Sequence, residues 1–124
     1  METKTEKIEK TTDLTYLMEL SDGNKTFVKE MINLFLSENP EEIRAFEKGI
    51  AEKNYKGIKT VAHKLRSTIP FIGLDKVIEK EVAEIEALAS EMGDIKEIES
   101  RFLKIKSACE KAYIELNPVS SVIS

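Results

Sequence analysis

Apolar residues recur along most of this chain at the three-to-four-residue spacing of an amphipathic helix, and this spacing limits the fold more than any other feature. The most regular run lies near the C-terminus, where the steps alternate between four and three residues: Ile98, Phe102, Ile105, Cys109, Ala112 and Leu116. A seam of this kind belongs in the core of a helical bundle. Because 124 residues suffice for one compact domain, we predict a single all-α domain.

Turn and capping residues divide the first half of the chain into helices. We expect a first helix over 14–20, capped by Asp13, and a second helix that follows the turn at 21–24 and ends near Asn39. Asn39 and Pro40 have the pattern of an N-cap followed by a first helical proline. The sequence therefore predicts a separate third helix beginning at Pro40.

Two further helices precede the regular seam. The first runs from about Tyr55 toward Phe71, and Pro70 within it predicts a kink or an early end near Ile69. Asp75 is placed to cap the next helix.

Short connections between long helices favour antiparallel neighbours. We therefore predict an up-down antiparallel four-helix bundle with one or two additional short N-terminal helices, formed by residues 13–117. Asn117 and Pro118 are expected to end the last helix. Residues 1–12, which are charged and aperiodic, and residues 118–124, which are rich in serine, are expected to be flexible tails.

Composition argues against several classes of function. A formal charge of -4 is unlike that of nucleic-acid binders, which carry clustered Lys and Arg, and no apolar run approaches the roughly 20 residues of a membrane span. Cys109 is the only cysteine, so no intrachain disulfide can form. We expect Cys109 to lie in the core and the protein to be cytoplasmic. One histidine is too few for a carboxylate-bridged metal site, and the chain has no Gly-rich phosphate loop. We predict no metal, no cofactor and a monomeric state.

The single histidine, His63, lies on the fourth helix. At 100° per residue the apolar side chains of that helix share one stripe, and His63 lies almost opposite it, facing solvent. Lys59, Lys64 and Arg66 are close to it, which predicts a cationic patch that attracts an anion. An exposed imidazole offers a ring nitrogen as a nucleophile, and phosphoryl transfer needs little beyond an in-line nucleophile and balancing positive charge.

Residues 62–73, AHKLRSTIPFIG, resemble the signature of the histidine phosphotransfer (HPt) domain family. That signature is A-H-x-L-K-G, followed by small residues and a glycine ten positions after the histidine. The spacing fits throughout, and the resemblance covers Asp13 to Tyr113. Arg66 stands in place of the usual lysine and Ser67 in place of the usual glycine. The resemblance implies that His63 is the phosphorylated residue.

The resemblance also implies roles for the neighbours of His63. Ala62 and Leu65 would be structural, and Gly73 would let a neighbouring helix approach. The residues expected to stabilise the phosphoryl group are Arg66, Lys64 and Ser67. A docking surface for receiver domains is expected on the second and fourth helices, including Lys59, Ile32, Leu36 and Phe71.

The resulting prediction is a phosphoryl carrier in a two-component phosphorelay, and not an enzyme. His63 would accept a phosphoryl group from the aspartyl phosphate of a receiver domain in a hybrid sensor histidine kinase and pass it to the receiver aspartate of a response regulator. Mg²⁺ would come from the receiver. Two alternatives stay open: an HPt-like module that docks without being phosphorylated, and a substrate domain at the head of a chemotaxis-type kinase. A lone surface histidine without any function is the simplest reading, and the motif spacing argues against it.

Overall fold

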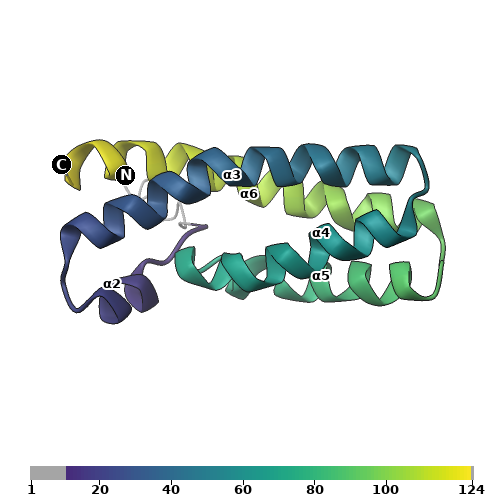
Figure 1. Ribbon diagram of the computed structural model, residues 1–124, viewed down its shortest axis with the longest axis horizontal. Helices are drawn as coiled ribbons and strands as arrows, with labels where there is room; N and C mark the ends of the chain where they lie inside the picture. The colour runs from purple at the N-terminus through teal and green to yellow at the C-terminus, as the bar shows by residue number, and fades with distance from the viewer. Residues whose placement is uncertain (1–10, 124) are drawn as a thin grey trace, which may run out of the picture.

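The computed structural model describes the backbone of residues 11–123 and the side chains of residues 11–118. This part of the chain forms five α-helices and one 3-10 helix and has no β-strand, so the predicted all-α class is confirmed (Figure 1). Within the same residues, no helix is both long and apolar enough to cross a bilayer.

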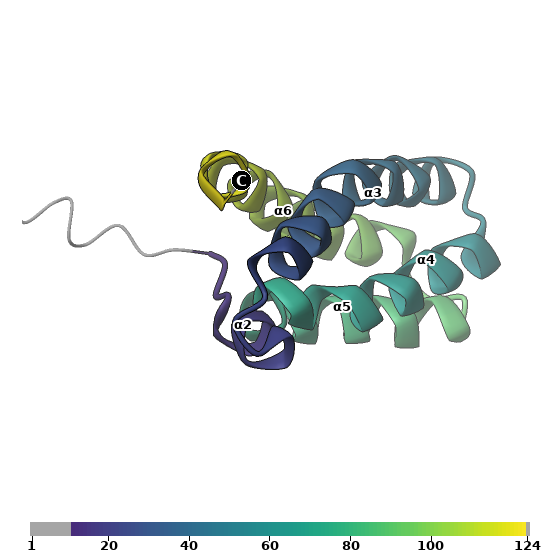
Figure 2. The same ribbon diagram turned by 60° about the vertical axis from the view of Figure 1, so that its left-hand side comes forward.

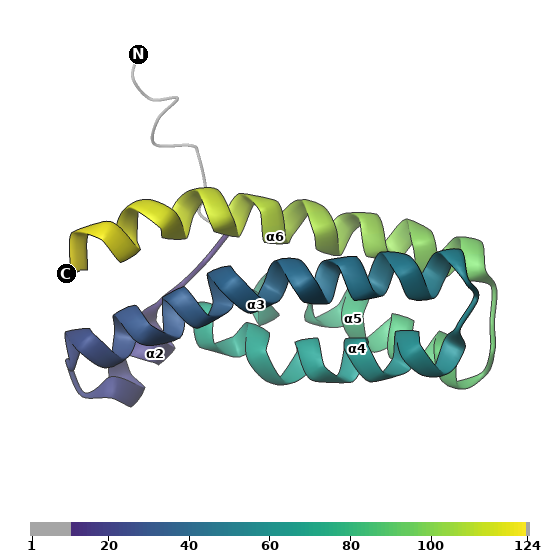
Figure 3. The same ribbon diagram turned by 45° about the horizontal axis from the view of Figure 1, so that its top comes forward.

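Four long helices share one apolar core. Helix α3 (Lys25–Ala51) packs against α4 (Tyr55–Thr68) and α6 (Ile95–Ile123), and α5 (Asp75–Ser90) packs against the same two helices. Figures 1 and 3 show them lying side by side along the longest axis of the molecule. The fully buried side chains of this core include Phe46, Ile32, Ile58, Leu65, Ile78, Ile85, Ile98 and Ile105. Each such side chain contributes about 1.5–3 kcal/mol by leaving water, so the shared core is what holds the helices together.

A short helix, α2 (Thr15–Ser21), lies across one end of this bundle and packs on α3 and on the 3-10 helix η1 (Ile69–Ile72) (Figure 2). Asp13 supports its start, because its Oδ1 accepts a hydrogen bond of 2.9 Å from the Thr15 N–H, although the N-cap position itself is Leu14. The buried side chain of α2 is Leu17.

The N-terminal segment before α2 is attached to the bundle. The backbone N–H groups of Thr11 and Thr12 donate to the Glu115 carboxylate at 2.7 and 2.9 Å. The prediction of a flexible tail over 1–12 is therefore wrong for these two residues, because a carboxylate on α6 satisfies their donors. Residues 1–10 of that predicted tail lie outside the described residues.

Helix α3 is continuous through Pro40, so the predicted break after Asn39 is wrong. Asn39 is not a solvent-facing cap: its side chain is buried, and its Oδ1 accepts a 2.5 Å hydrogen bond from the Tyr113 hydroxyl. The buried positions Phe35 and Phe46 lie on the same stripe on either side of the proline. The free energy gained by burying that stripe exceeds the free energy lost with the one backbone hydrogen bond that a proline removes.

The prediction for Pro70 is confirmed. Helix α4 ends at Thr68, and the chain continues as η1 from Ile69. Gly73 closes this turn in the left-handed region, with φ of +77°. Asp75, however, does not cap α5: the N-cap position is Leu74 and carries no side-chain cap, while Asp75 lies in the first turn, where its charge complements the helix dipole.

Helix α6 continues through Pro118 to Ile123, so the predicted helix end at Asn117 is wrong. A proline removes the hydrogen bond to the carbonyl four residues earlier, which here belongs to Ile114. The Ile114 side chain is 74% exposed, so this carbonyl lies on the solvent side of the helix, where water can replace the lost donor. The predicted flexible tail from 118 is helical as far as residue 123.

Candidate functional site

His63 lies on the outer side of α4. Its side chain is 77% exposed, whereas Ile58 and Leu65 on the opposite side of the helix are fully buried. The predicted outward orientation of His63 is therefore confirmed. The burial of the apolar stripe fixes the rotation of α4 about its axis and so fixes the direction in which the imidazole points.

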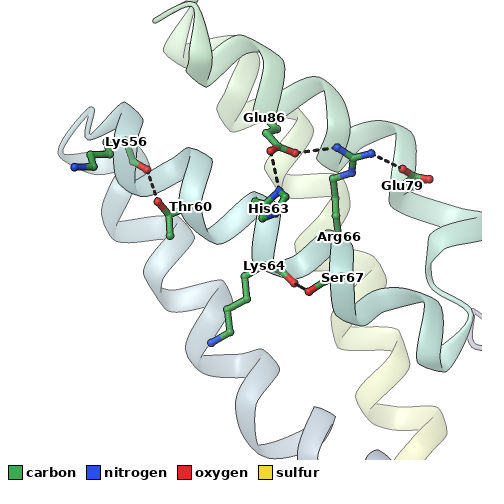
Figure 4. A network of polar contacts seen from close by, with 8 residues as sticks. All are labelled: Lys56, Thr60, His63, Lys64, Arg66, Ser67, Glu79 and Glu86. Atoms are coloured by element: carbon green, nitrogen blue, oxygen red, sulfur yellow. Dashed lines mark hydrogen bonds and ion pairs between the residues drawn. The ribbon is translucent and has the colours of Figure 1, made fainter.

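The imidazole is held by a carboxylate from the neighbouring helix. His63 Nδ1 lies 3.1 Å from Glu86 Oε2, and Figure 4 shows Glu86 reaching from α5 to the ring. Hydrogen bonds from Arg66 and then from His63 lower the pKa of Glu86, so this carboxylate is ionised and can only accept. In the neutral imidazole, Nδ1 therefore carries the hydrogen, and Nε2 has the lone pair.

Arg66 lies one turn beyond His63 and is bound by two carboxylates of α5. Its Nη1 lies 2.9 Å from Glu86 Oε1, and its Nη2 lies 3.1 Å from Glu79 Oε2 (Figure 4). These hydrogen bonds raise the pKa of Arg66 further, so the guanidinium stays charged. The predicted cationic surroundings of His63 need correction, because the charged side chain that contacts the ring is Glu86.

The other residues expected to stabilise a phosphoryl group point elsewhere. Lys64 Nζ lies 3.7 Å from Glu42 Oε2, on the side of α4 that faces α3. The Ser67 hydroxyl donates to the Lys64 carbonyl at 2.7 Å. Lys59 is exposed on the outer face of α4. Within the described residues, the hydrogen bonds and ion pairs of the His63 ring involve Glu86, and neither Lys64 nor Ser67 takes part.

The structural residues of the motif occupy the interior. Ala62 and Leu65 are fully buried. A Cβ added to Gly73 would meet the backbone oxygen of Asp13 at 2.5 Å. Gly73 therefore admits the backbone of the segment that leads into α2, and α2 itself packs on η1. The Asp13 N–H also donates to the Ile72 carbonyl at 2.8 Å, which ties this segment to the end of η1.

The expected docking residues have different degrees of exposure. Ile32 is fully buried, so its assignment to an outward surface is wrong; it lies on the same stripe of α3 as Val28. Leu36 and Phe71 are half-buried and pack against the core. Leu34, which was not among the expected docking residues, is 47% exposed.

Glu86 and Glu79 are the residues of this site that the sequence reasoning missed. They are seven residues apart on α5, a spacing of about two helical turns that places both on one face of the helix. The sequence spacing alone could therefore have predicted that these two glutamates share a face of their helix. Whether that face meets His63, however, depends on how α5 packs against α4.

Comparison with models of known protein families, with curated proteins and with solved structures finds no match to this chain. The site is therefore interpreted from its own chemistry. In residues 11–118, no group of three or more His, Cys, Asp and Glu side chains is arranged to hold a metal ion. What the site offers is one exposed, oriented imidazole with a free Nε2 and a guanidinium one turn away.

Proposed function

We propose that the chain is a histidine phosphotransfer protein of a two-component phosphorelay, with His63 Nε2 as the phosphoryl acceptor. In the first step, the Nε2 lone pair attacks the phosphorus of a receiver aspartyl phosphate. The P–N bond forms, the P–O bond to the aspartate breaks, and the aspartate leaves as a carboxylate. In the second step, the aspartate of another receiver takes the phosphoryl group back from Nε2. Both transfers are in-line displacements that need mainly positioning and charge balance.

The observation that carries this proposal is the contact between His63 Nδ1 and Glu86. Attack by Nε2 places positive charge on the imidazole ring, and an adjacent carboxylate stabilises that charge while Nδ1 keeps its hydrogen. The side chain is exposed enough for another protein to reach it.

Arg66 supplies positive charge beside the incoming phosphoryl group in this proposal. Its guanidinium bridges Glu79 and Glu86, so it can turn one N–H toward phosphoryl oxygens while Glu79 still holds the other side. Lys64 and Ser67 contribute only if they leave their present partners.

The remaining parts of the proposal concern architecture and partners. The colour gradient in Figure 1 changes direction from each long helix to the next, which supports the up-down antiparallel four-helix arrangement of the HPt family. The partners would be receiver domains of a hybrid sensor histidine kinase and of a response regulator, which bring their own Mg²⁺. The chain would act as a cytoplasmic, monomeric carrier and not as a catalyst.

The proposal is tested by phosphoryl transfer from receiver domains encoded in the same genome, phosphorylated in the presence of Mg²⁺. The wild-type chain should acquire an acid-labile, base-stable label, and His63→Gln should acquire none while keeping its helical circular dichroism. A fully labelled His63→Gln chain would reject the assignment.

The docking-only alternative has one observation in its favour: both sides of the Arg66 guanidinium are already bound by carboxylates. A docking-only module would bind receivers with equal affinity in the wild type and in His63→Gln, and neither chain would carry label.

A further inference from the structure

A small apolar cavity lies between α3 and the end of α4. Its volume is about 170 Å³, and its apolar walls come from residues that include Leu34, Phe35, Phe71 and Ile72. Pockets for drug-sized ligands are usually about 300–1,000 Å³, so this cavity suits a single side chain of another protein better than a free metabolite. Leu34 is 47% exposed at its edge, which leaves the cavity accessible.

A buried carboxylate marks one wall of the cavity. The side chain of Glu42 is only 7% exposed. Its contacts with Asn39 Nδ2, at 3.5 Å, and with Lys64 Nζ, at 3.7 Å, are both longer than the usual 2.7–3.2 Å of a hydrogen bond. Burial raises the pKa of Glu42 by more than the Lys64 ammonium and the Asn39 amide lower it. A buried carboxylate of this kind gains more from a close cation than an exposed one does.

Glu42 also lines a wider groove of about 650 Å³ between α3 and α4. Glu38 contributes a second carboxylate to this groove, and Glu41 contributes a third that is paired with Arg44. Lys56 and Lys64 contribute two ammonium groups. Glu38 borders both the groove and the apolar cavity. Glu42 also borders both depressions, so two carboxylates and the Lys64 ammonium meet beside the apolar cavity. This junction is therefore apolar on one side and has excess negative charge on the other.

We propose that Glu42 is a specificity-determining residue that binds a guanidinium or ammonium group of the docking partner, whose adjacent apolar side chain fills the 170 Å³ cavity. The inference rests on the proposed function, in which the partner is a receiver domain. The incoming cation replaces Lys64 at Glu42, and the released Lys64 ammonium becomes available beside His63. Receivers that carry an Arg or Lys next to an exposed apolar side chain would be preferred over receivers with an acidic residue at that place.

The first test does not depend on phosphorylation. The full chain is titrated with n-hexylguanidinium while amide resonances are followed by NMR, and n-hexanol serves as the neutral probe. The wild type should show shifts at Thr68 and Phe71, and Glu42→Gln should bind n-hexylguanidinium about tenfold more weakly. Glu41→Gln is the matched control, because Glu41 lines the same groove but is 71% exposed and already paired with Arg44. Glu41→Gln should bind n-hexylguanidinium as tightly as the wild type does. The neutral n-hexanol should bind the wild type and both variants with equal affinity.

Equal affinity of the wild type and Glu42→Gln for n-hexylguanidinium would overturn the inference, as would shifts confined to another part of the molecule. A second measurement uses a receiver that labels His63: Glu42→Gln should raise its KM about tenfold with little change in kcat. If no receiver labels the wild type, the proposed function fails, while the n-hexylguanidinium result still decides whether Glu42 is a cation site.

Discussion

His63 and Glu86 meet across two helices, with Nδ1 3.1 Å from Oε2, although 23 residues separate them in the chain. The imidazole is 77% exposed and the carboxylate only 17%, so the exposed group is oriented by a more protected one. In the neutral ring, this relationship assigns the hydrogen to Nδ1 and the lone pair to Nε2. The predicted reactivity of the site follows from that assignment.

Replacing Glu86 should therefore impair transfer without unfolding the chain. We expect Glu86→Gln to lower the rate of phosphoryl transfer to His63 by about 10- to 100-fold, because the ring loses the group that sets its tautomer and orientation. Single-turnover labelling measures the rate, and ¹⁵N shifts of the imidazole report the tautomer. Glu81→Gln is the matched control, since Glu81 also lies on α5 but binds Arg101 and not His63 or Arg66; it should stay close to the wild-type rate. Equal rates for wild type and Glu86→Gln would contradict the assigned role.

Glu42 should make stability fall as the pH rises. Burial raises its pKa above the ordinary value of 4.5, so the folded state holds the proton more tightly than the unfolded state does. The contribution of Glu42 to the stability of the fold is fully present below pH 4.5, and it is lost as the pH rises through the folded-state pKa. Glu42→Gln has no such loss. Thermal melts should show the variant more stable than the wild type at pH 7, by on the order of 1 kcal/mol, with the difference disappearing near pH 4. A wild type that is the more stable chain at pH 7 would show that Glu42 is well compensated.

Glu115 should have the opposite pH dependence. Burial acts to raise its pKa, but hydrogen bonds from Thr11 and Thr12 outweigh burial and lower it. The stability it contributes is present above the ordinary value of 4.5 and is lost as the pH falls through the lower folded-state pKa. In Glu115→Gln at pH 7, hydrogen exchange at the Thr11 and Thr12 amides should be at least about tenfold faster than in the wild type. Unchanged exchange would mean that these amides are protected by something else.

Gly73 should tolerate a methyl group less well than Gly23 does. Both glycines have positive φ, +77° and +81°, so alanine is strained at either position by about 1–2 kcal/mol. At Gly73 the added Cβ also meets the Asp13 backbone, whereas at Gly23 it meets no atom within 4 Å. Denaturant unfolding should therefore show a clearly larger loss of stability for Gly73→Ala. Equal losses would mean that the segment before α2 can move aside at little cost.

Side-chain periodicity predicted the buried seams well, because burial dominates the energetics of a helical bundle. All six residues of the predicted C-terminal seam are buried, and so is the stripe of α4 that directs His63 outward. Local rules were less reliable. Pro40 and Pro118 were read as helix boundaries, yet α3 and α6 continue through them. At Pro40 the apolar stripe keeps its phase across the proline, and that continuity was the better signal.

Contacts between helices could not be predicted from spacing. Glu86 is an ordinary glutamate in the sequence, and its contact with His63 exists only because α4 and α5 pack side by side. The same packing binds Arg66 to two carboxylates and turns the predicted cationic patch into a balanced one. Ile32 was misplaced for a related reason: it was expected on an outward docking surface, whereas the packing of α3 against the other helices buries it.

The most direct test of the central claim is to identify the ring nitrogen that carries phosphorus. The chain has one histidine, so ¹⁵N-histidine labelling gives a single imidazole to observe. After phosphorylation by a receiver, ¹⁵N–³¹P coupling should appear at Nε2, while Nδ1 keeps its hydrogen beside Glu86. Coupling at Nδ1, or an imidazole that stays unmodified while label appears elsewhere, would contradict the account.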